Sequence, residues 1–69
     1  SKRVQVCLPY EGVSRIHALI VRENTTCFVE DLNSTNGTWV NGKVLEPRTP
    51  CVLNEGDKVR FAEIEYIFR

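Results

Sequence analysis

The sequence lacks an excess of charge of either sign, and it lacks a long apolar run. Its 69 residues include nine lysines and arginines and nine aspartates and glutamates, so the charges balance. The basic residues form no stripe and do not alternate with aromatic residues, so we expect no direct nucleic-acid partner and no membrane partner. No apolar run is long enough to cross a bilayer. An anion bound by this chain must be held by a few local donors.

Cysteine and histidine are also scarce. The three cysteines, Cys7, Cys27 and Cys51, are an odd number and lie far apart, and His17 is the only histidine. This spacing fits neither a disulfide framework nor a zinc site, and we expect buried, reduced thiols, no metal and no cofactor. Residues 1–6 lack the apolar stretch and cleavage pattern of a signal peptide. We therefore expect an intracellular, reducing location.

The common signatures of enzymes are missing as well. Neither a P-loop nor a G-x-G-x-x-G run occurs in the sequence. Ser14, His17 and Asp31 could be imagined as a catalytic triad, but no nucleophile elbow surrounds the serine and nothing identifies an oxyanion hole. We expect a binding protein and not an enzyme.

The apolar pattern predicts an all-β fold. Short runs alternate with a period close to two, and β-branched and aromatic residues fill the runs between turn signals. No stretch has a helical repeat, and Asn41-Gly42 predicts a two-residue hairpin turn. The spacing fits an antiparallel β-sandwich or barrel, and the length allows one domain at most, residues 1–69. We predict strands at residues 4–8, 16–22, 26–31, 38–40, 43–45, 50–53, 57–61 and 64–68.

Two polar clusters are candidates for a binding site. Ser14, Arg15 and His17 lie close together where a glycine-containing loop meets an apolar strand. A hydroxyl beside a guanidinium suits an oxyanion, although exposed Ser-Arg pairs are common and a histidine at a strand start is more often structural. The second cluster, residues 31–42, is dense in short polar side chains, which form either a phosphate-binding loop or two ordinary turns.

Together the two clusters resemble the forkhead-associated (FHA) domain. The resemblance rests on Ser14-Arg15-Ile16-His17, on the run Asp31-Leu32-Asn33-Ser34-Thr35-Asn36-Gly37-Thr38-Trp39-Val40-Asn41-Gly42, and on Leu53-x-Glu55-Gly56-Asp57-x-Val59-x-Phe61. It covers nearly the whole chain. FHA domains are among the modules that read phosphorylated motifs.

The resemblance implies an antiparallel β-sandwich of the FHA type whose loops bind a phosphothreonine peptide. Carried over by position, Ser14 would donate its hydroxyl to the phosphate, and Arg15 would supply charge to the phosphate or to the peptide backbone. Thr35 matches a position that contacts the phosphothreonine, and Asn36 one that contacts the peptide main chain. The remaining matched residues, His17, Gly37 and Asn41, would brace these loops.

The resemblance also leaves questions open. It implies further N-terminal strands and a Gly-Arg pair just upstream of Ser1, so on this pattern the fold is N-terminally incomplete and its phosphate pocket lacks an arginine. A phosphate-independent protein–protein or self-association (homodimer) module is therefore the alternative function. By family analogy we expect a nuclear setting in signalling such as the DNA damage response. Residues 9–12 would read the peptide positions beside the phosphothreonine.

Overall fold

Eight strands and no helix make up the computed structural model, which describes residues 2–10 and 13–69, with side chains described for residues 2–7 and 16–69. No helix in this described part has the length and apolar character needed to cross a lipid bilayer. The strands are β1 (Lys2–Tyr10), β2 (Val13–Glu23), β3 (Thr26–Asp31), β4 (Thr38–Val40), β5 (Lys43–Val44), β6 (Cys51–Leu53), β7 (Lys58–Phe61) and β8 (Ile64–Ile67).

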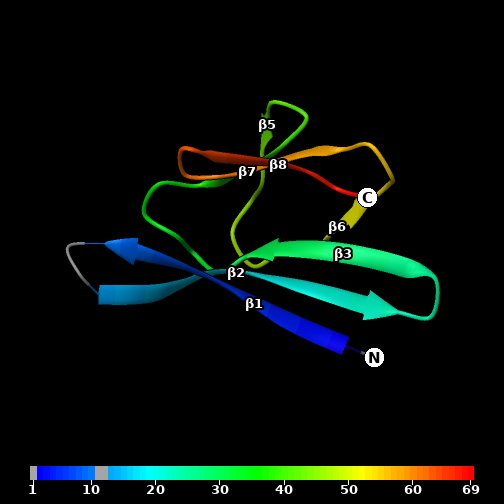
Figure 1. Ribbon diagram of the computed structural model, residues 1–69, viewed down its shortest axis with the longest axis horizontal. Coiled ribbons are helices and arrows are strands. Elements are labelled where there is room, and N and C mark those ends of the chain that lie inside the picture. The colour runs from blue at the N-terminus through cyan, green and yellow to red at the C-terminus, as the bar shows by residue number, and fades with distance from the viewer. Residues whose placement is uncertain (1, 11–12) are drawn as a thin grey trace.

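The strands form two antiparallel sheets that pack as layers (Figure 1). One sheet has the strand order β1-β2-β3-β6, and the other has the order β5-β4-β7-β8. The all-β class and the eight strands are as predicted, although β1 and β2 extend further than expected and β5 is shorter. The turn from Asn41 to Gly42 is the predicted two-residue hairpin, since both residues have positive φ, 52° and 82°, and Val40 pairs with Lys43.

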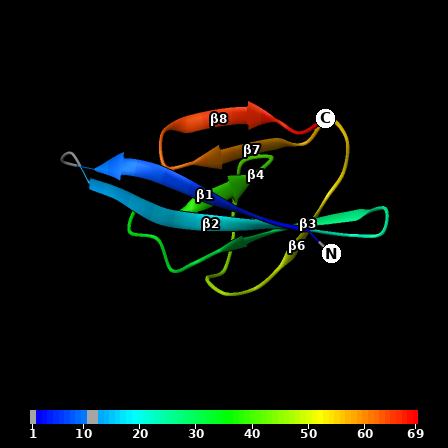
Figure 2. The same ribbon diagram turned by 60° about the horizontal axis from the view of Figure 1, so that its bottom comes forward.

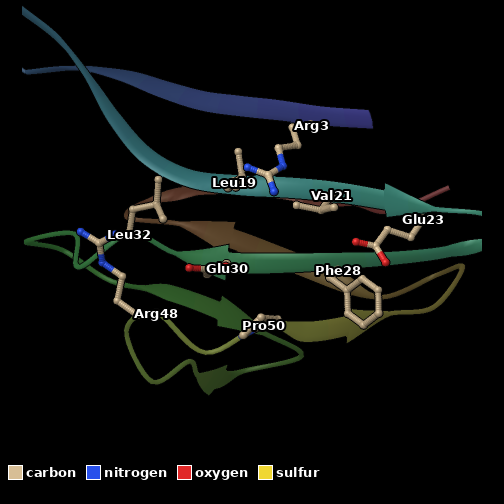
Figure 3. A pocket seen from close by; sticks show the side chains of 9 residues that line it. All are labelled: Arg3, Leu19, Val21, Glu23, Phe28, Glu30, Leu32, Arg48 and Pro50. Atoms are coloured by element: carbon tan, nitrogen blue, oxygen red, sulfur yellow. The ribbon is translucent and has the colours of Figure 1, made fainter. Parts of the chain in front are cut away.

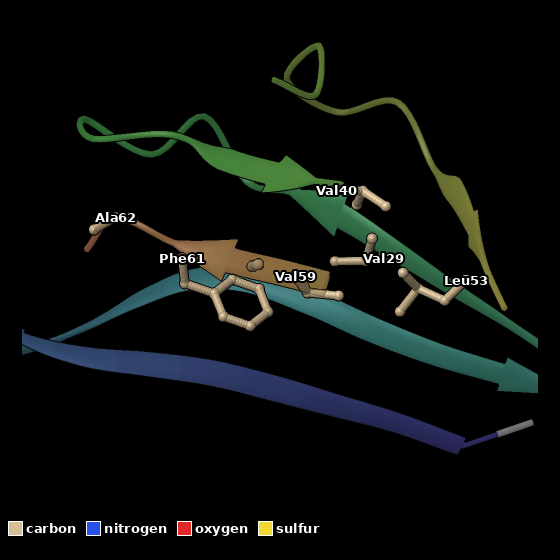
Figure 4. Close-up of a cluster of buried hydrophobic side chains, with 7 residues drawn as sticks. Val29, Val40, Leu53, Val59, Phe61 and Ala62 are labelled. Atoms are coloured by element: carbon tan, nitrogen blue, oxygen red, sulfur yellow. The ribbon is translucent and has the colours of Figure 1, made fainter. Parts of the chain in front are cut away.

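The core lies between the two sheets, where alternate residues of each strand point inward (Figure 4). It is small and mostly aliphatic, as the length requires. The prediction of buried thiols is wrong for Cys7, which is exposed, whereas Cys27 and Cys51 are partly buried against the core and all three are free. The buried apolar residues are Ala18, Val29, Val40, Leu53, Val59, Phe61 and Ala62.

The sandwich is less well filled between β1 and β8. A hollow of about 520 Å³ lies there, lined by inward-facing residues of both sheets that include Val6, Ile20 and Phe68. Tyr66 pairs with core-facing Val59 and yet is 54% exposed. The two sheets therefore pack most closely around β2, β3, β4 and β7, which are the strands that carry the polar residues described next.

Candidate functional site

A loop of residues 34–37, hereafter the 34–37 loop, connects β3 to β4 and is organised around the carboxylate of Asp31. Asp31 ends β3 and is only 2% exposed. Its Oδ2 accepts a hydrogen bond from the backbone N–H of Ser34 at 3.1 Å, and its Oδ1 accepts one from the Ser34 hydroxyl. The hydroxyl of Thr38, which is fully buried at the start of β4, donates to the same Oδ1 at 2.7 Å. One side chain thus ties both ends of the loop together.

The hydrogen bonds to Asp31 determine its ionisation. Burial raises the pKa of this carboxyl group, but the hydrogen bonds from Ser34 and Thr38 outweigh burial and leave the pKa below its ordinary value. The group is therefore a carboxylate at neutral pH. Because three donors already satisfy its oxygens, its negative charge is held inside the loop and away from the loop surface.

The hydroxyl of Ser34 closes the loop. While it donates to Asp31, its oxygen also accepts a hydrogen bond from the backbone N–H of Gly37 at 3.0 Å. Short polar side chains form such local bonds to the backbone readily, and here they replace the ladder that the strands would otherwise continue. The four residues of the loop therefore have a defined shape before any partner is bound.

His17 connects this loop to β2. Its Nε2 donates a hydrogen bond to the carbonyl oxygen of Gly37 at 2.7 Å, so Nε2 carries a hydrogen. The ring is 2% exposed and meets the Phe61 ring edge-on, with the centroids 5.9 Å apart. The His17 carbonyl in turn accepts from the backbone N–H of Leu32 at 3.1 Å. The imidazole is thus held between the loop and the core and links the loop to a residue three positions after Ser14.

Gly37 occupies a position that only glycine accommodates well. Its φ is +88°, and a Cβ built on it would lie 2.8 Å from Cη2 of Trp39. Its carbonyl accepts both from His17 and from the backbone N–H of Ala62, at 3.0 Å. Either constraint alone disfavours a side chain here, since positive φ is costly for other residues and a contact under 3 Å is a clash.

The remaining residues of the loop, Thr35 and Asn36, are exposed at its tip. The loop lies at the same end of the molecule as the start of β2, as the views in Figures 1 and 2 agree. Ser14 and Arg15 lie in this part of β2, where their backbones pair with Pro9 and Leu8 of β1. The side chains of Ser14 and Arg15 are outside the described part of the structure. So are residues 11 and 12 and the side chains of residues 9 and 10, the proposed reader of flanking peptide positions.

Asn41 lies at the other end of β4 from the 34–37 loop. Its Nδ2 donates to Oδ1 of Asp57 at 3.1 Å, and its Oδ1 accepts from the backbone N–H of Lys58 at 3.0 Å. These bonds fix the turn between β6 and β7. The support that the resemblance assigns to Asn41 is thus given, in the described contacts, to this turn and not to the residues around Ser14 and Asn36.

The sequence analysis did not assign roles to Ser34 and Thr38, although both form direct hydrogen bonds to Asp31. A signal was present in the spacing Asp31-x-x-Ser34, since an Asp or Asn side chain commonly bonds backbone N–H groups a few residues ahead in a turn. Thr38 gave no such signal, because an alternating strand pattern does not reveal which buried hydroxyl has an acceptor.

Comparison with known proteins identifies the family. The family model for the FHA domain matches residues 1–62. The chain is 47% identical over 49 residues to the E3 ubiquitin-protein ligase rnf8 of Danio rerio, covering 70% of this chain and 10% of that protein. It is 42% identical over 62 residues to the human angiogenic factor with G patch and FHA domains 1, covering 81% of this chain and 9% of that protein.

A bacterial relative shows the same likeness. The transcriptional regulatory protein EmbR of Mycobacterium tuberculosis is 36% identical over 64 residues, covering 93% of this chain and 16% of that protein. The chain therefore spans less than a fifth of the length of these curated relatives. The match and the fold together show that the chain belongs to the FHA domain family, whose members are protein-interaction modules that generally bind phosphothreonine.

Proposed function

We propose that this chain binds a phosphothreonine-containing peptide or protein through Ser14, Arg15, Thr35 and Asn36. The observation that carries the proposal is the hydrogen bond from His17 to the carbonyl of Gly37, at 2.7 Å. It joins the strand that contains Ser14 and Arg15 to the loop that presents Thr35 and Asn36. Two short polar segments that lie far apart in the sequence are thereby available to one ligand.

The shape of the 34–37 loop favours binding because it is set in advance. Binding costs free energy when a loop must first be ordered, on the order of 1–2 kcal/mol for each residue whose backbone becomes fixed. Here the bonds of Ser34 to Asp31 and Gly37 have already fixed the backbone on either side of Thr35 and Asn36. A peptide would therefore meet exposed donors and acceptors whose positions need little adjustment.

Electrostatics provides the dependence on phosphorylation. A phosphate carries a charge of about −1.5 to −2 near neutral pH and offers three strong acceptor oxygens, whereas threonine offers one hydroxyl. In the proposed site the hydroxyl of Ser14 and the guanidinium of Arg15 supply donors and positive charge. The negative charge of Asp31 opposes this only weakly, since three donors neutralise its oxygens from within the protein.

The proposal is tested by titrating the chain with matched phosphothreonine and threonine peptides. We expect measurable binding of the phosphorylated peptide only. Ser14→Ala, Thr35→Ala and Asn36→Ala should each weaken it by roughly 1–3 kcal/mol, the scale for losing a hydrogen bond to a charged group or leaving its partner unsatisfied.

Matched controls come from exposed residues of the same types elsewhere. Thr25→Ala and Asn54→Ala change an exposed threonine and an exposed asparagine away from the proposed site. They should leave the affinity unchanged. Equal binding of both peptides, or equal effects of the site and control substitutions, would refute the proposal.

A phosphate-independent association with a second copy is the alternative function, and the apolar outer face of the first sheet, described below, favours it. The two functions use different surfaces and can coexist. By analogy with the family we also propose a nuclear setting, which imaging of the tagged chain in cells would test.

A further inference from the structure

The sheet β1-β2-β3-β6 has a second face, turned away from the core, which is largely apolar (Figure 3). Register places a row of side chains across all four strands, because Arg3 pairs with Val21, Val21 with Phe28, and Phe28 with Val52. The next row pairs Leu19 with Glu30. We call this surface the outer face and define it by Arg3, Leu19, Val21, Glu23, Phe28, Glu30, Leu32, Arg48, Pro50 and Val52.

The outer face is hollowed and only partly covered. A hollow of about 480 Å³ lies over it, lined by apolar residues of β2 and β3 and by Leu32 and Pro50 (Figure 3). Leu19, Val21 and Phe28 are half-buried by one another, and Val52 is 48% exposed. An antiparallel sheet that faces water on one side normally carries polar residues there. A contiguous apolar surface instead is typical of a surface that contacts another molecule.

Charges of opposite sign stand at the two ends of the outer face. Glu23 ends β2 and pairs with Thr26 at the start of β3. Arg48 lies beyond the far end of β3, where its backbone N–H donates to the carbonyl of Asp31 at 2.8 Å. The five residue steps from Thr26 to Asp31 separate these ends by roughly 17 Å, at about 3.3 Å per residue. Within the described residues, neither Glu23 nor Arg48 belongs to a salt bridge.

We propose that the outer face is a docking surface for a second copy of this chain, related by a two-fold axis through the centre of the face. A two-fold rotation about an axis normal to the sheet exchanges its two ends. It therefore places Arg48 of each copy opposite Glu23 of the other, twice, and brings Val21 and Phe28 of the two copies together at the centre. A two-fold interface uses the same patch on both subunits and so requires this self-complementarity.

The charge pattern favours a second copy over a peptide of one charge sign. A uniformly acidic partner would meet Arg48 at one end and be repelled by Glu23 at the other, and a basic partner would meet the reverse. The surface does not include Thr35 or Asn36. The inference is therefore independent of phosphopeptide binding, and either can fail without the other.

The size of the outer face predicts a weak dimer. Four strands about 4.8 Å apart and roughly 17 Å long cover about 300 Å² in projection. Two sheets packed on such an area bury less than the roughly 1,600 Å² total of a standard stable interface. The dimer should therefore populate only at concentrations well above those used in routine gel filtration.

Sedimentation velocity over a series of chain concentrations from about 10 μM to about 1 mM tests the proposal. We expect the sedimentation coefficient to rise with concentration toward that of a dimer. Phe28→Ser should shift the dissociation constant upward at least tenfold, whereas the matched control Val44→Ser, which changes a 57% exposed valine of the other sheet, should not.

A charge exchange gives the sharper result. Arg48→Glu and Glu23→Arg should each weaken association, because each creates two like-charge contacts across the axis. The double variant restores both pairs with reversed sign and should recover most of the wild-type association. These residues are exposed, and thermal melting confirms that each variant is folded. A monomer at every concentration, or a dimer unaffected by Phe28→Ser and by both single charge variants, overturns the proposal.

Discussion

The substitution Thr38→Val removes one hydroxyl from the centre of the site and changes little else. Thr38 is fully buried at the start of β4, and its hydroxyl donates to Oδ1 of Asp31 at 2.7 Å. Valine has nearly the same shape and an equal preference for strands, so it fills the same space. The carboxylate keeps its bonds from Ser34 and loses the one from Thr38. The experiment therefore isolates one hydrogen bond to a buried charge.

The expected cost is about 2 kcal/mol in the free energy of unfolding at neutral pH. A hydrogen bond to a charged group contributes about 1.5–3 kcal/mol, and two remaining donors on the carboxylate place the loss toward the lower part of that range. A domain of this size is stable by roughly 3–10 kcal/mol, so the variant should still fold. The melting temperature should fall by roughly 8–16 °C, at about 4–8 °C for each kcal/mol.

The dependence on pH gives the prediction its direction. Burial raises the pKa of Asp31, but the bonds from Ser34 and Thr38 lower it more, so its folded pKa lies below its unfolded pKa. A group with a lowered folded pKa stabilises the protein fully above the unfolded pKa, near 4, and loses that contribution as the pH falls through the folded pKa. The stability difference between wild type and Thr38→Val should therefore be largest at neutral pH and shrink in acid.

Urea denaturation at pH 7 and at several values below pH 4 measures both effects. Thr26→Val is the matched control, because Thr26 is an exposed strand threonine and its replacement should cost less than about 0.5 kcal/mol. If Thr38→Val were as stable as wild type at pH 7, or if the difference between them grew in acid, the account of Asp31 as the anchor of the 34–37 loop would be refuted.

Two further predictions concern the glycine of the loop and the turn that Asn41 supports. Gly37→Ala should destabilise the chain by about 2–4 kcal/mol in thermal unfolding, since it adds a Cβ 2.8 Å from the Trp39 ring at a φ of +88°. Gly56→Ala is the control for backbone strain alone, because its φ is +92° and nothing lies within 4 Å of the added Cβ, so an equal loss in both variants would contradict the clash. Asp57→Asn should flatten the acid limb of the stability–pH curve, because hydrogen bonds from the backbone N–H of Asn54 and from Asn41 lower the pKa of Asp57 and its contribution is lost as the pH falls through that lowered value. An unchanged acid limb would contradict this.

The strands could be predicted from the sequence because their signals are local. Period-two alternation places Val59 and Phe61 on one face, and positive φ at Asn41 and Gly42 is encoded by the two residues themselves. The exposure of Cys7 could not be predicted in this way. Burial of a residue on an edge strand depends on what the other sheet covers, and that is not a local property.

The candidate site was only partly predictable for a related reason. The polar residues of the 34–37 loop stood out by composition, but a short hydroxyl or amide bonds equally well to backbone, to a carboxylate or to a ligand. The structure shows that Ser34 and Thr38 bond inward to Asp31 while Thr35 and Asn36 are exposed. Asn41 shows the converse, because its partners Asp57 and Lys58 are distant in sequence and no local pattern could name them.

Isothermal titration with one peptide in its phosphothreonine and threonine forms tests the central claim most directly. The account predicts binding of the phosphorylated form, and a loss of roughly tenfold or more in affinity for Asn36→Ala with no change for Asn54→Ala, since each 1.4 kcal/mol corresponds to a factor of ten. Equal affinity for the two forms of the peptide would contradict it.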